Sequence, residues 1–247
     1  MPRATAFGTA ADEYDRLRPA PHPDALAAVL PPDARLVVDL AAGTGLVTRA
    51  VLASTDAVVV AVEPDARMLD RLGGTRALRA QGVAEAIPVR SGTADAVLAA
   101  SAWHWFDPEP ATAEIARVLR PGGTLGLLWS RADPTVPWVA EVRGIGKAAA
   151  DGSAALSRRG FDVELPPGHG LVGQGGTTGD ATVVGWTRTM TRDEVAGMVC
   201  TYSGVLELDP DTRADVRHRV RARLGEMFDD DRVEVPFETV CRHWRRD

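Results

Sequence analysis

Between residues 35 and 130 the chain alternates short apolar runs with segments whose apolar residues recur at helical spacing. Five runs have the composition of strands, the third of them weakly: Leu36–Leu40, Ala57–Val62, Ala77–Gln81, Asp95–Ser101 and Thr124–Trp129. Strands that alternate with helices are joined in parallel, and a run as apolar as Ala57–Val62 is typical of a strand covered on both faces. The sequence therefore predicts an α/β fold, a doubly wound and mostly parallel sheet with helices on both faces.

Three helical patterns lie between these runs. They cover Leu46–Ala53, Asp65–Leu72 and Ala111–Leu119. The first follows a glycine turn, Ala41–Gly45. The second is predicted to end at Gly73 and the third at Pro121, because glycine and proline commonly terminate helices.

We expect one domain over residues 1–247, built in three parts. Residues 1–34 are rich in proline and predict a helical arm, residues 35–130 form a Rossmann-like ligand-binding core, and residues 131–247 form a cover on the substrate side. The last part is predicted to contain a strand, two helices and a closing strand: Val183–Met190, Arg192–Val199, about 211–226 and Val235–Cys241. Six glycines between residues 168 and 179 indicate either a lid or a surface insertion.

Composition excludes several kinds of chemistry. Lys147 is the single lysine, and Glu141 and Ala148 stand where a P-loop around it needs a glycine and a hydroxyl. A Schiff-base enzyme would have to use the same lysine. Two cysteines are too few for a disulfide framework, and the five histidines lack metal-ligand spacing, so we expect no metal site. No apolar run resembles a membrane span or a signal peptide, so we expect a cytoplasmic protein without a membrane partner.

The net charge of −6 argues against nucleic acid as the main partner, because phosphate binding depends on clustered basic residues. One segment runs against this trend, with five arginines between residues 213 and 223. Val216, Val220 and Leu224 form an apolar stripe along the same segment. The stripe favours an amphipathic helix with a solvated face over a helix that reads nucleic acid.

Residues 37–45, Val-Val-Asp-Leu-Ala-Ala-Gly-Thr-Gly, are a strand, turn and helix start that indicate a ligand site. Glycines there let a ligand approach the backbone, and the helix start offers N–H groups to an anion. The next strand ends in Glu63, where an acid accepts hydrogen bonds from ribose hydroxyls. Thr48 stands where the dinucleotide fingerprint needs a small residue, and Asp39 would repel a pyrophosphate but suit an ammonium group. Ribose, ammonium and carboxylate together favour S-adenosylmethionine over NAD.

Five motifs then occur in the order of one known family: Asp39-x-Ala41-x-Gly43-x-Gly45, Val62-Glu63-Pro64-x-x-x-Met68-Leu69, Gly82-Val-Ala84-Glu85-Ala-Ile-Pro88, His104-Trp105-Phe106-Asp107 and Ile115-Ala-Arg-Val-Leu-Arg-Pro-Gly-Gly123. With Tyr14-Asp15-x-x-Arg18-Pro19 in the arm, they resemble the type-11 group of class I S-adenosylmethionine-dependent methyltransferases. The resemblance covers about residues 7–138 and is weak beyond them.

The resemblance implies a set of cofactor-binding residues: Tyr14, Arg18, Asp39, Ala41, Gly43, Gly45, Glu63, Met68, Ala84, Glu85 and Ser101. By the family's pattern, the turn would hold the methionine part of the cofactor and the acid after the second strand its ribose. The methionine and the following loop would contact the adenine, and the serine would line the methyl-transfer site. The tyrosine and arginine of the arm would close over the cofactor.

Two residues depart from the family's pattern, and three have a second interpretation. Ala41 stands where glycine is commoner, and Val83 where many members have an acid that binds the adenine amino group. Asp39 could instead cap the turn, Glu85 could be an exposed loop acid, and Met68 could be a core residue.

Methyl transfer from a sulfonium depends on alignment of donor and acceptor and on exclusion of water. Aromatic faces stabilise a cationic donor, so we expect Trp103, Trp105 and Trp129, which follow or end strands, to lie at the substrate. His104 is the candidate general base, and a packed structural histidine is the alternative.

We therefore expect an S-adenosylmethionine-dependent methyltransferase that releases S-adenosyl-L-homocysteine and acts on an oxygen, nitrogen or carbon of a small molecule. Two alternatives remain open. One is an NAD-dependent oxidoreductase, which Thr48 disfavours, and the other is a non-catalytic cofactor-binding module on the same fold.

Overall fold

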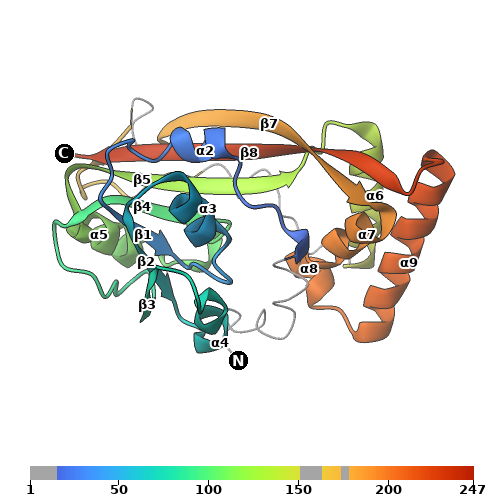
Figure 1. The fold of residues 1–247 in the computed structure, drawn as a ribbon, viewed down its shortest axis with the longest axis horizontal. Helices are drawn as coiled ribbons and strands as arrows, with labels where there is room; N and C mark the ends of the chain where they lie inside the picture. The colour runs from blue at the N-terminus through green and yellow to red at the C-terminus, as the bar shows by residue number, and fades with distance from the viewer. Residues whose placement is uncertain (1–15, 151–162, 174–177) are drawn as a thin grey trace.

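The computed structural model describes residues 16–150, 163–173 and 178–247, which form one eight-stranded sheet with helices around it (Figure 1). The strands are β1 (Leu36–Leu40), β2 (Val58–Glu63), β3 (Leu78–Gln81), β4 (Ala94–Ala100), β5 (Leu119–Ala132), β6 (Leu171–Val172), β7 (Asp180–Thr191) and β8 (Arg232–Arg246). Their order is β3-β2-β1-β4-β5-β8-β6, and β7 pairs with β8. The strands from β3 to β5 are parallel, and β8 is antiparallel to β5, β6 and β7. The predicted α/β class and mostly parallel sheet are confirmed.

Helices cover both faces of this sheet. They are α2 (Pro23–Ala27), α3 (Leu46–Ser54), α4 (Ala66–Leu69), α5 (Pro108–Val118), α6 (Pro137–Ala149), α7 (Arg192–Cys200), α8 (Ser203–Leu206) and α9 (Pro210–Met227), with 3-10 turns η2 (Asp70–Leu72) and η3 (Trp103–Trp105). Successive strand residues point to opposite faces, so Val37 packs in the apolar cluster of α2 and α3, whereas Val38 packs in that of α5. None of the helices in the described ranges is long and apolar enough to cross a membrane.

The third predicted helix ends one residue earlier than expected. Leu119 already belongs to β5 and pairs with Ala94, and the next registered pair is Thr124 with Ala96. The intervening residues 120–123, with the Pro-Gly-Gly turn, therefore bulge opposite Asp95. The side chain of Asp95 joins this bulge to the start of β1, because it pairs with Arg120 and accepts the backbone N–H of Leu36 at 2.8 Å.

The expectation that Ala57–Val62 is covered on both faces holds only in part. Val58, at the start of β2, is 49% exposed, whereas Val62, near its end, is buried in the core. β2 lies next to β3, the strand at one edge of the sheet. The face of β2 that these two valines share is thus covered only toward the carboxyl end of the strand.

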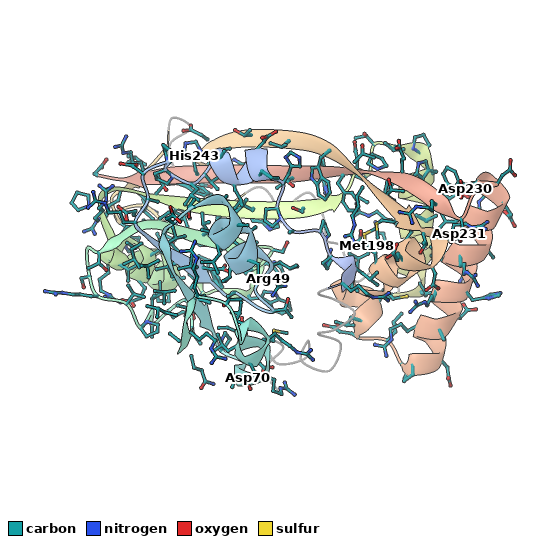
Figure 2. All side chains as sticks on the ribbon, in the orientation of Figure 1. Arg49, Asp70, Met198, Asp230, Asp231 and His243 are labelled. Atoms are coloured by element: carbon teal, nitrogen blue, oxygen red, sulfur yellow. The ribbon has the colours of Figure 1, made fainter. Side chains whose placement is uncertain are left out.

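Strands β5, β7 and β8 continue beyond the carboxyl ends of β1 and β4 and carry α6 to α9, which we call the helical cap (Figure 1). The cap has its own apolar cluster, in which Met198 lies inside the group of helices (Figure 2). Phe237 of β8 and Ala132 of β5 close this cluster on the side of the sheet. Leu17, from the arm that precedes α2, is 0% exposed within it. The arm is therefore packed onto the cap.

The predicted arginine-rich helix is α9, and several of its arginines pair with acids. Arg217 pairs with Asp193 of α7 at 2.8 Å, and Arg223 pairs with Glu141 of α6 at 2.5 Å. Val216, Val220 and Leu224 are buried on the opposite side of the helix. These contacts agree with the solvated-face interpretation.

Part of the glycine-rich segment 168–179 lies far from where a lid would close. Leu171 and Val172 form β6, which pairs with Arg246 and Arg245 of β8. Arg245 in turn pairs with Thr124, near the amino end of β5. The lid interpretation is therefore unsupported for these residues, and residues 174–177 lie outside the described ones.

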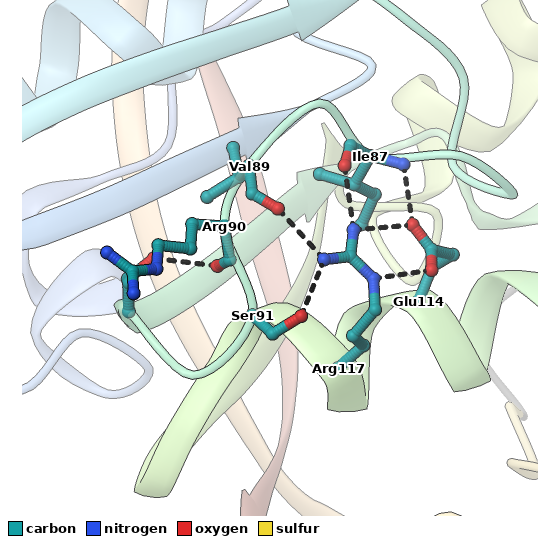
Figure 3. Close-up of polar contacts among 7 residues, drawn as sticks. Ile87, Val89, Arg90, Ser91, Glu114 and Arg117 are labelled. Atoms are coloured by element: carbon teal, nitrogen blue, oxygen red, sulfur yellow. Dashed lines mark hydrogen bonds and ion pairs between the residues drawn. The ribbon is translucent and has the colours of Figure 1, made fainter.

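One polar network fastens the loop before β4 to α5 (Figure 3). Arg117 donates to the carbonyl oxygens of Ile87, at 2.8 Å, and Val89, at 3.0 Å, and to the hydroxyl of Ser91 at 3.0 Å. Glu114 pairs with Arg117 at 2.6 Å and accepts the backbone N–H of Ile87 at 2.8 Å. The guanidinium beside Glu114 holds the pKa of that carboxyl below its usual range.

We expect Arg117→Met to lower the free energy of unfolding by about 2 kcal/mol, because two carbonyls and a carboxylate lose a charged donor. Urea unfolding followed by circular dichroism measures this. Arg90→Met, in the same loop, is the control, since Arg90 is exposed, and it should stay within about 0.5 kcal/mol of the unmodified chain. Equal effects of the two substitutions would contradict the role of the network.

Candidate active site

The carboxyl ends of β1, β2 and β4 meet at one edge of the sheet. Leu40, the last residue of β1, pairs with Val62 of β2, and Asp39 pairs with Leu98 of β4. The turn after β1, the acid that ends β2 and Ser101 after β4 therefore lie side by side. This edge is where open parallel sheets bind their ligands.

The carboxylate of Glu63 ties the first turn to the second strand. It is 4% exposed and accepts the backbone N–H of Gly43 at 2.9 Å and of Asp65 at 3.1 Å. Burial raises the pKa of Glu63, and the hydrogen bonds from the two N–H groups partly offset this rise. The sulfur of Met68 lies 4.0 Å from the position that a Cβ on Gly43 would take. The structure thus brings together Gly43, Glu63 and Met68, three of the predicted cofactor residues.

The two glycines of the turn have different surroundings. Both have positive φ, 56° at Gly43 and 91° at Gly45, which favours glycine. A Cβ on Gly45 would lie 2.0 Å from the buried side chain of Leu72, so packing requires glycine here in addition to the backbone conformation. A Cβ on Gly43 would meet only the sulfur of Met68, and no closer atom of the described residues. The backbone at Gly43 is therefore the part of the turn that a ligand can approach.

Asp39 is buried under this turn and holds α3 to β1. It is 1% exposed, and its Oδ2 accepts the hydroxyl of Thr48 at 2.5 Å. Burial raises the pKa of Asp39 to about 7, the hydrogen bonds from Thr48 oppose the rise, and the charge of Glu63 adds to it. Thr48 therefore departs from the dinucleotide fingerprint because it is the partner of Asp39. Contact of Asp39 with a ligand's ammonium group stays a prediction.

Two residues at this edge have strained backbones. Ala41 has φ 56° and Ser101 has φ 52°, and they are the two non-glycine residues with positive φ in the described part of the chain. The left-handed conformation costs about 1–2 kcal/mol for a residue with a Cβ. Ala41 thus adopts the conformation for which the family more often uses glycine. Strain of this kind is commonly found at functional sites.

The tryptophans after β4 and in β5 are more buried than a substrate wall requires. Trp129 was expected to end its strand, but β5 runs on to Ala132 because these residues stay paired with β8. Trp103 is 8% and Trp129 6% exposed, and both belong to the apolar cluster beneath α5. Trp105 is half-buried, with its ring 4.8 Å from that of His104, which is exposed. Substrate contact by the three tryptophans stays a prediction, and burial favours Trp105 for it. Partial desolvation lowers the pKa of His104 below 6.5.

The loop and arm residues have contacts of their own. Glu85 accepts the backbone N–H of Asp107 at 2.8 Å and so fixes the start of α5, while Ala84 is buried in the core. Arg18 lies over the ring of Tyr202 in the cap, 4.8 Å from the guanidinium carbon to the ring centroid. Tyr14 lies outside the described residues.

Reasoning from the sequence missed four contacts of these residues: Thr48 with Asp39, Leu72 with Gly45, and Tyr202 with Arg18 and with Arg143 of α6. The first was open to inference, because a hydroxyl one turn into the helix can reach an acid at the strand end. The other three depend on packing between distant segments. No group of three His, Cys, Asp or Glu side chains placed to hold a metal occurs among the described residues.

The parallel sheet, the glycine turn after β1 and the acid that ends β2 are typical of Rossmann-like proteins that bind a cofactor containing a nucleoside. Residues 38–127 match a family model described as a methyltransferase domain. The chain is 38% identical to an uncharacterized methyltransferase of Mycobacterium tuberculosis over 242 residues, 96% of this chain and 93% of that protein. It is 30% identical to an uncharacterized methyltransferase-like protein of Schizosaccharomyces pombe over 218 residues, 83% of this chain and 80% of that one.

A solved structure described as a putative type II methyltransferase from Anaeromyxobacter dehalogenans has the same fold. Its TM-score is 0.63 at 20% identity, over 93% of this chain and 97% of that one. The chain belongs to the methyltransferase family and is a class I S-adenosylmethionine-dependent enzyme. Its cofactor is S-adenosylmethionine.

The two glycines give a matched test of the turn. We expect Gly45→Ala to lower the free energy of unfolding by about 2–3 kcal/mol, because the methyl group overpacks against Leu72. Gly43→Ala should cost about 1 kcal/mol through its backbone alone. It should nevertheless weaken binding of S-adenosylhomocysteine at least about tenfold, measured by calorimetry, because its methyl group occupies the ligand's side of the turn. Unchanged affinity in Gly43→Ala would place the cofactor elsewhere.

Proposed function

We propose that the chain transfers the methyl group to a small-molecule acceptor, held between the carboxyl edge of the sheet and the arm and cap. The observation that carries this proposal is the burial of Leu17 in the apolar cluster of the cap. Arm and cap are thereby packed together beyond the strand ends. A site covered from that side admits a small molecule more readily than a folded protein or a nucleic acid.

The residues at the sheet edge fit the cofactor. Each oxygen of Glu63 accepts one backbone N–H and has a lone pair left for a ribose hydroxyl. The backbone at Gly43 is open to the methionine part, and Met68 stands beside it for the adenine. When bound, S-adenosylmethionine supplies a methyl group on a sulfonium, which makes a good leaving group. The chain's residues then have to align the acceptor and exclude water.

His104 is the group that we assign to proton removal from the acceptor. It is exposed after the end of β4, its ring lies tilted against that of Trp105 with the centroids 4.8 Å apart, and partial desolvation lowers its pKa. A lowered pKa favours the neutral imidazole, which is the form that can accept a proton. An acceptor that is already a carboxylate would need no such base.

Transfer of labelled methyl groups from S-adenosylmethionine into a metabolite extract, with mass spectrometry of the product, tests the proposed function. A labelled small molecule is the expected result. Labelled protein or RNA in place of it would overturn the small-molecule assignment.

With the acceptor in hand, His104→Ala should lower kcat by about 100-fold, because general-base catalysis is lost. Its affinity for S-adenosylhomocysteine should stay within about twofold, since the role proposed for the ring is toward the acceptor and not the cofactor. The fall in kcat/KM below pH 6.5 should disappear in this variant. His218→Ala, on the exposed side of α9, is the control and should leave kcat and the pH dependence of kcat/KM unchanged. An unaltered kcat in His104→Ala would remove this histidine from the mechanism.

Cofactor binding should strengthen as the pH rises through 7. Asp39 has a pKa of about 7 in the free protein, and a cationic ligand group at the turn favours its ionised form. Protons therefore compete with the ligand below pH 7, and affinity should fall up to about tenfold per pH unit there. Calorimetry at pH 5.5–8 in the His104→Ala background isolates this effect. Asp39→Asn should flatten the profile, and an unchanged slope would show that another group is responsible.

A further inference from the structure

Tyr202, between α7 and α8, lies against two arginines from distant parts of the chain. The guanidinium carbon of Arg18, in the arm, is 4.8 Å from the centroid of its ring, and that of Arg143, in α6, is 5.3 Å from it. Arm, α6 and the end of α7 therefore meet at one aromatic ring. Guanidinium groups stack favourably on such rings, which fixes their position while their N–H donors remain usable.

Two polar groups of this cluster have hydrogen-bond donors that no acceptor among the described residues is shown to use. The hydroxyl of Tyr202 is buried and has no hydrogen-bond partner among the described residues. Arg143 donates to the carbonyl oxygen of Ala132 at 2.9 Å and pairs with no carboxylate in the described part of the chain. A buried hydroxyl left unpaired is costly, and native proteins usually keep such a group for a reason. A phenol O–H and the N–H groups of a guanidinium are all donors, and donors of this kind bind oxyanions.

The strand register places the cluster beyond the carboxyl edge of the sheet, where the predicted cofactor residues lie. β4 ends at Ala100, which pairs with Leu128 of β5, and Ala132 lies four residues further along β5. At about 3.3 Å per residue, Ala132 is about 13 Å beyond the end of β4. The guanidinium of Arg143, bonded to that residue's carbonyl, thus lies about one small molecule's length from Ser101.

We propose that Arg143 and Tyr202 bind an oxyanion of the methyl acceptor, a carboxylate or a phosphate, with Arg18 facing it from the arm. The acceptor is then an anionic small molecule whose charged group is held at the cap while its nucleophile reaches the sheet edge. This assignment rests on the proposed function, and it adds the substrate class. Under this proposal Arg18 contacts the acceptor, in addition to the closing role over the cofactor that the resemblance implies.

Binding of defined probes tests the site without knowledge of the acceptor. The melting temperature is measured with S-adenosylhomocysteine at saturation and with benzoate, phenyl phosphate or benzamide added. A concentration of about 10 mM suits such probes, because small fragments bind weakly. One or both anions should raise the melting temperature by about 2–4 °C, and neutral benzamide should not. The stronger of the two anions distinguishes a carboxylate from a phosphate.

Arg143→Met and Tyr202→Phe should each abolish the anion-dependent rise. Arg217→Met is the matched control, because it removes the same charge from the outer side of the cap, and it should keep the rise. Without anion, Tyr202→Phe should melt about 2–4 °C higher than the unmodified chain, since an unpaired buried hydroxyl is removed. Higher stability together with lost binding is a result that a purely structural tyrosine would not give.

Equal rises in all variants, or none with either anion in the unmodified chain, would overturn the site. Failure of the proposed function gives a different result, namely anion binding that depends on Arg143 and Tyr202 but no labelled small molecule from the extract. A labelled product that is neutral or cationic would overturn the anionic acceptor while leaving small-molecule methylation intact.

Discussion

The carboxylate of Glu63 is the contact on which the site depends. It joins the end of β2 to the turn after β1, because one oxygen accepts the N–H of Gly43 and the other that of Asp65. Burial alone would favour the protonated form, and the two N–H donors offset that tendency. Turn and acid are therefore in place before a ligand arrives, and less conformational freedom is lost on binding. Asp39 and Thr48 fasten the other side of the turn to α3.

Much of the core could be predicted from the sequence, because its patterns are local. Leu36–Leu40 is found as predicted, and the glycines, Glu63 and Met68 meet where strand order implies. The rest depends on contacts that leave no local signal. Burial of Trp103 and Trp129 follows from the way α5 and the sheet pack, which composition does not reveal. The glycine-rich segment gave no indication that Leu171 and Val172 would pair beside the start of β5.

The acceptor side shows the same limit more clearly. Leu17 stands in a proline-rich arm, and nothing in its neighbours indicates that it fills the apolar cluster of the cap. Tyr202 and Arg143 are about sixty residues apart and meet only because α6 and α7 pack against each other. The role of such residues depends on which side chains they meet in the folded chain, and their sequence neighbours do not show this. The family's sequence pattern accordingly covers the residues at the sheet edge and gives no indication of the acceptor contacts proposed in the arm and cap.

The long strands β5 and β8 have a further consequence for how acceptors are chosen. They remain paired from Thr124 with Arg245 to Ala132 with Phe237, so the cap stands on the same rigid ribbon that forms the core. A cap carried on a hinge could adjust to ligands of many sizes, whereas a cap carried on a continuous ladder is held at a fixed height. The length of the paired strands then sets the distance between the cap and the carboxyl edge of the sheet. Two residues added to or removed from both strands would change this distance by about 7 Å. Relatives that share the donor half could in this way acquire acceptors of other lengths through changes in strand length alone.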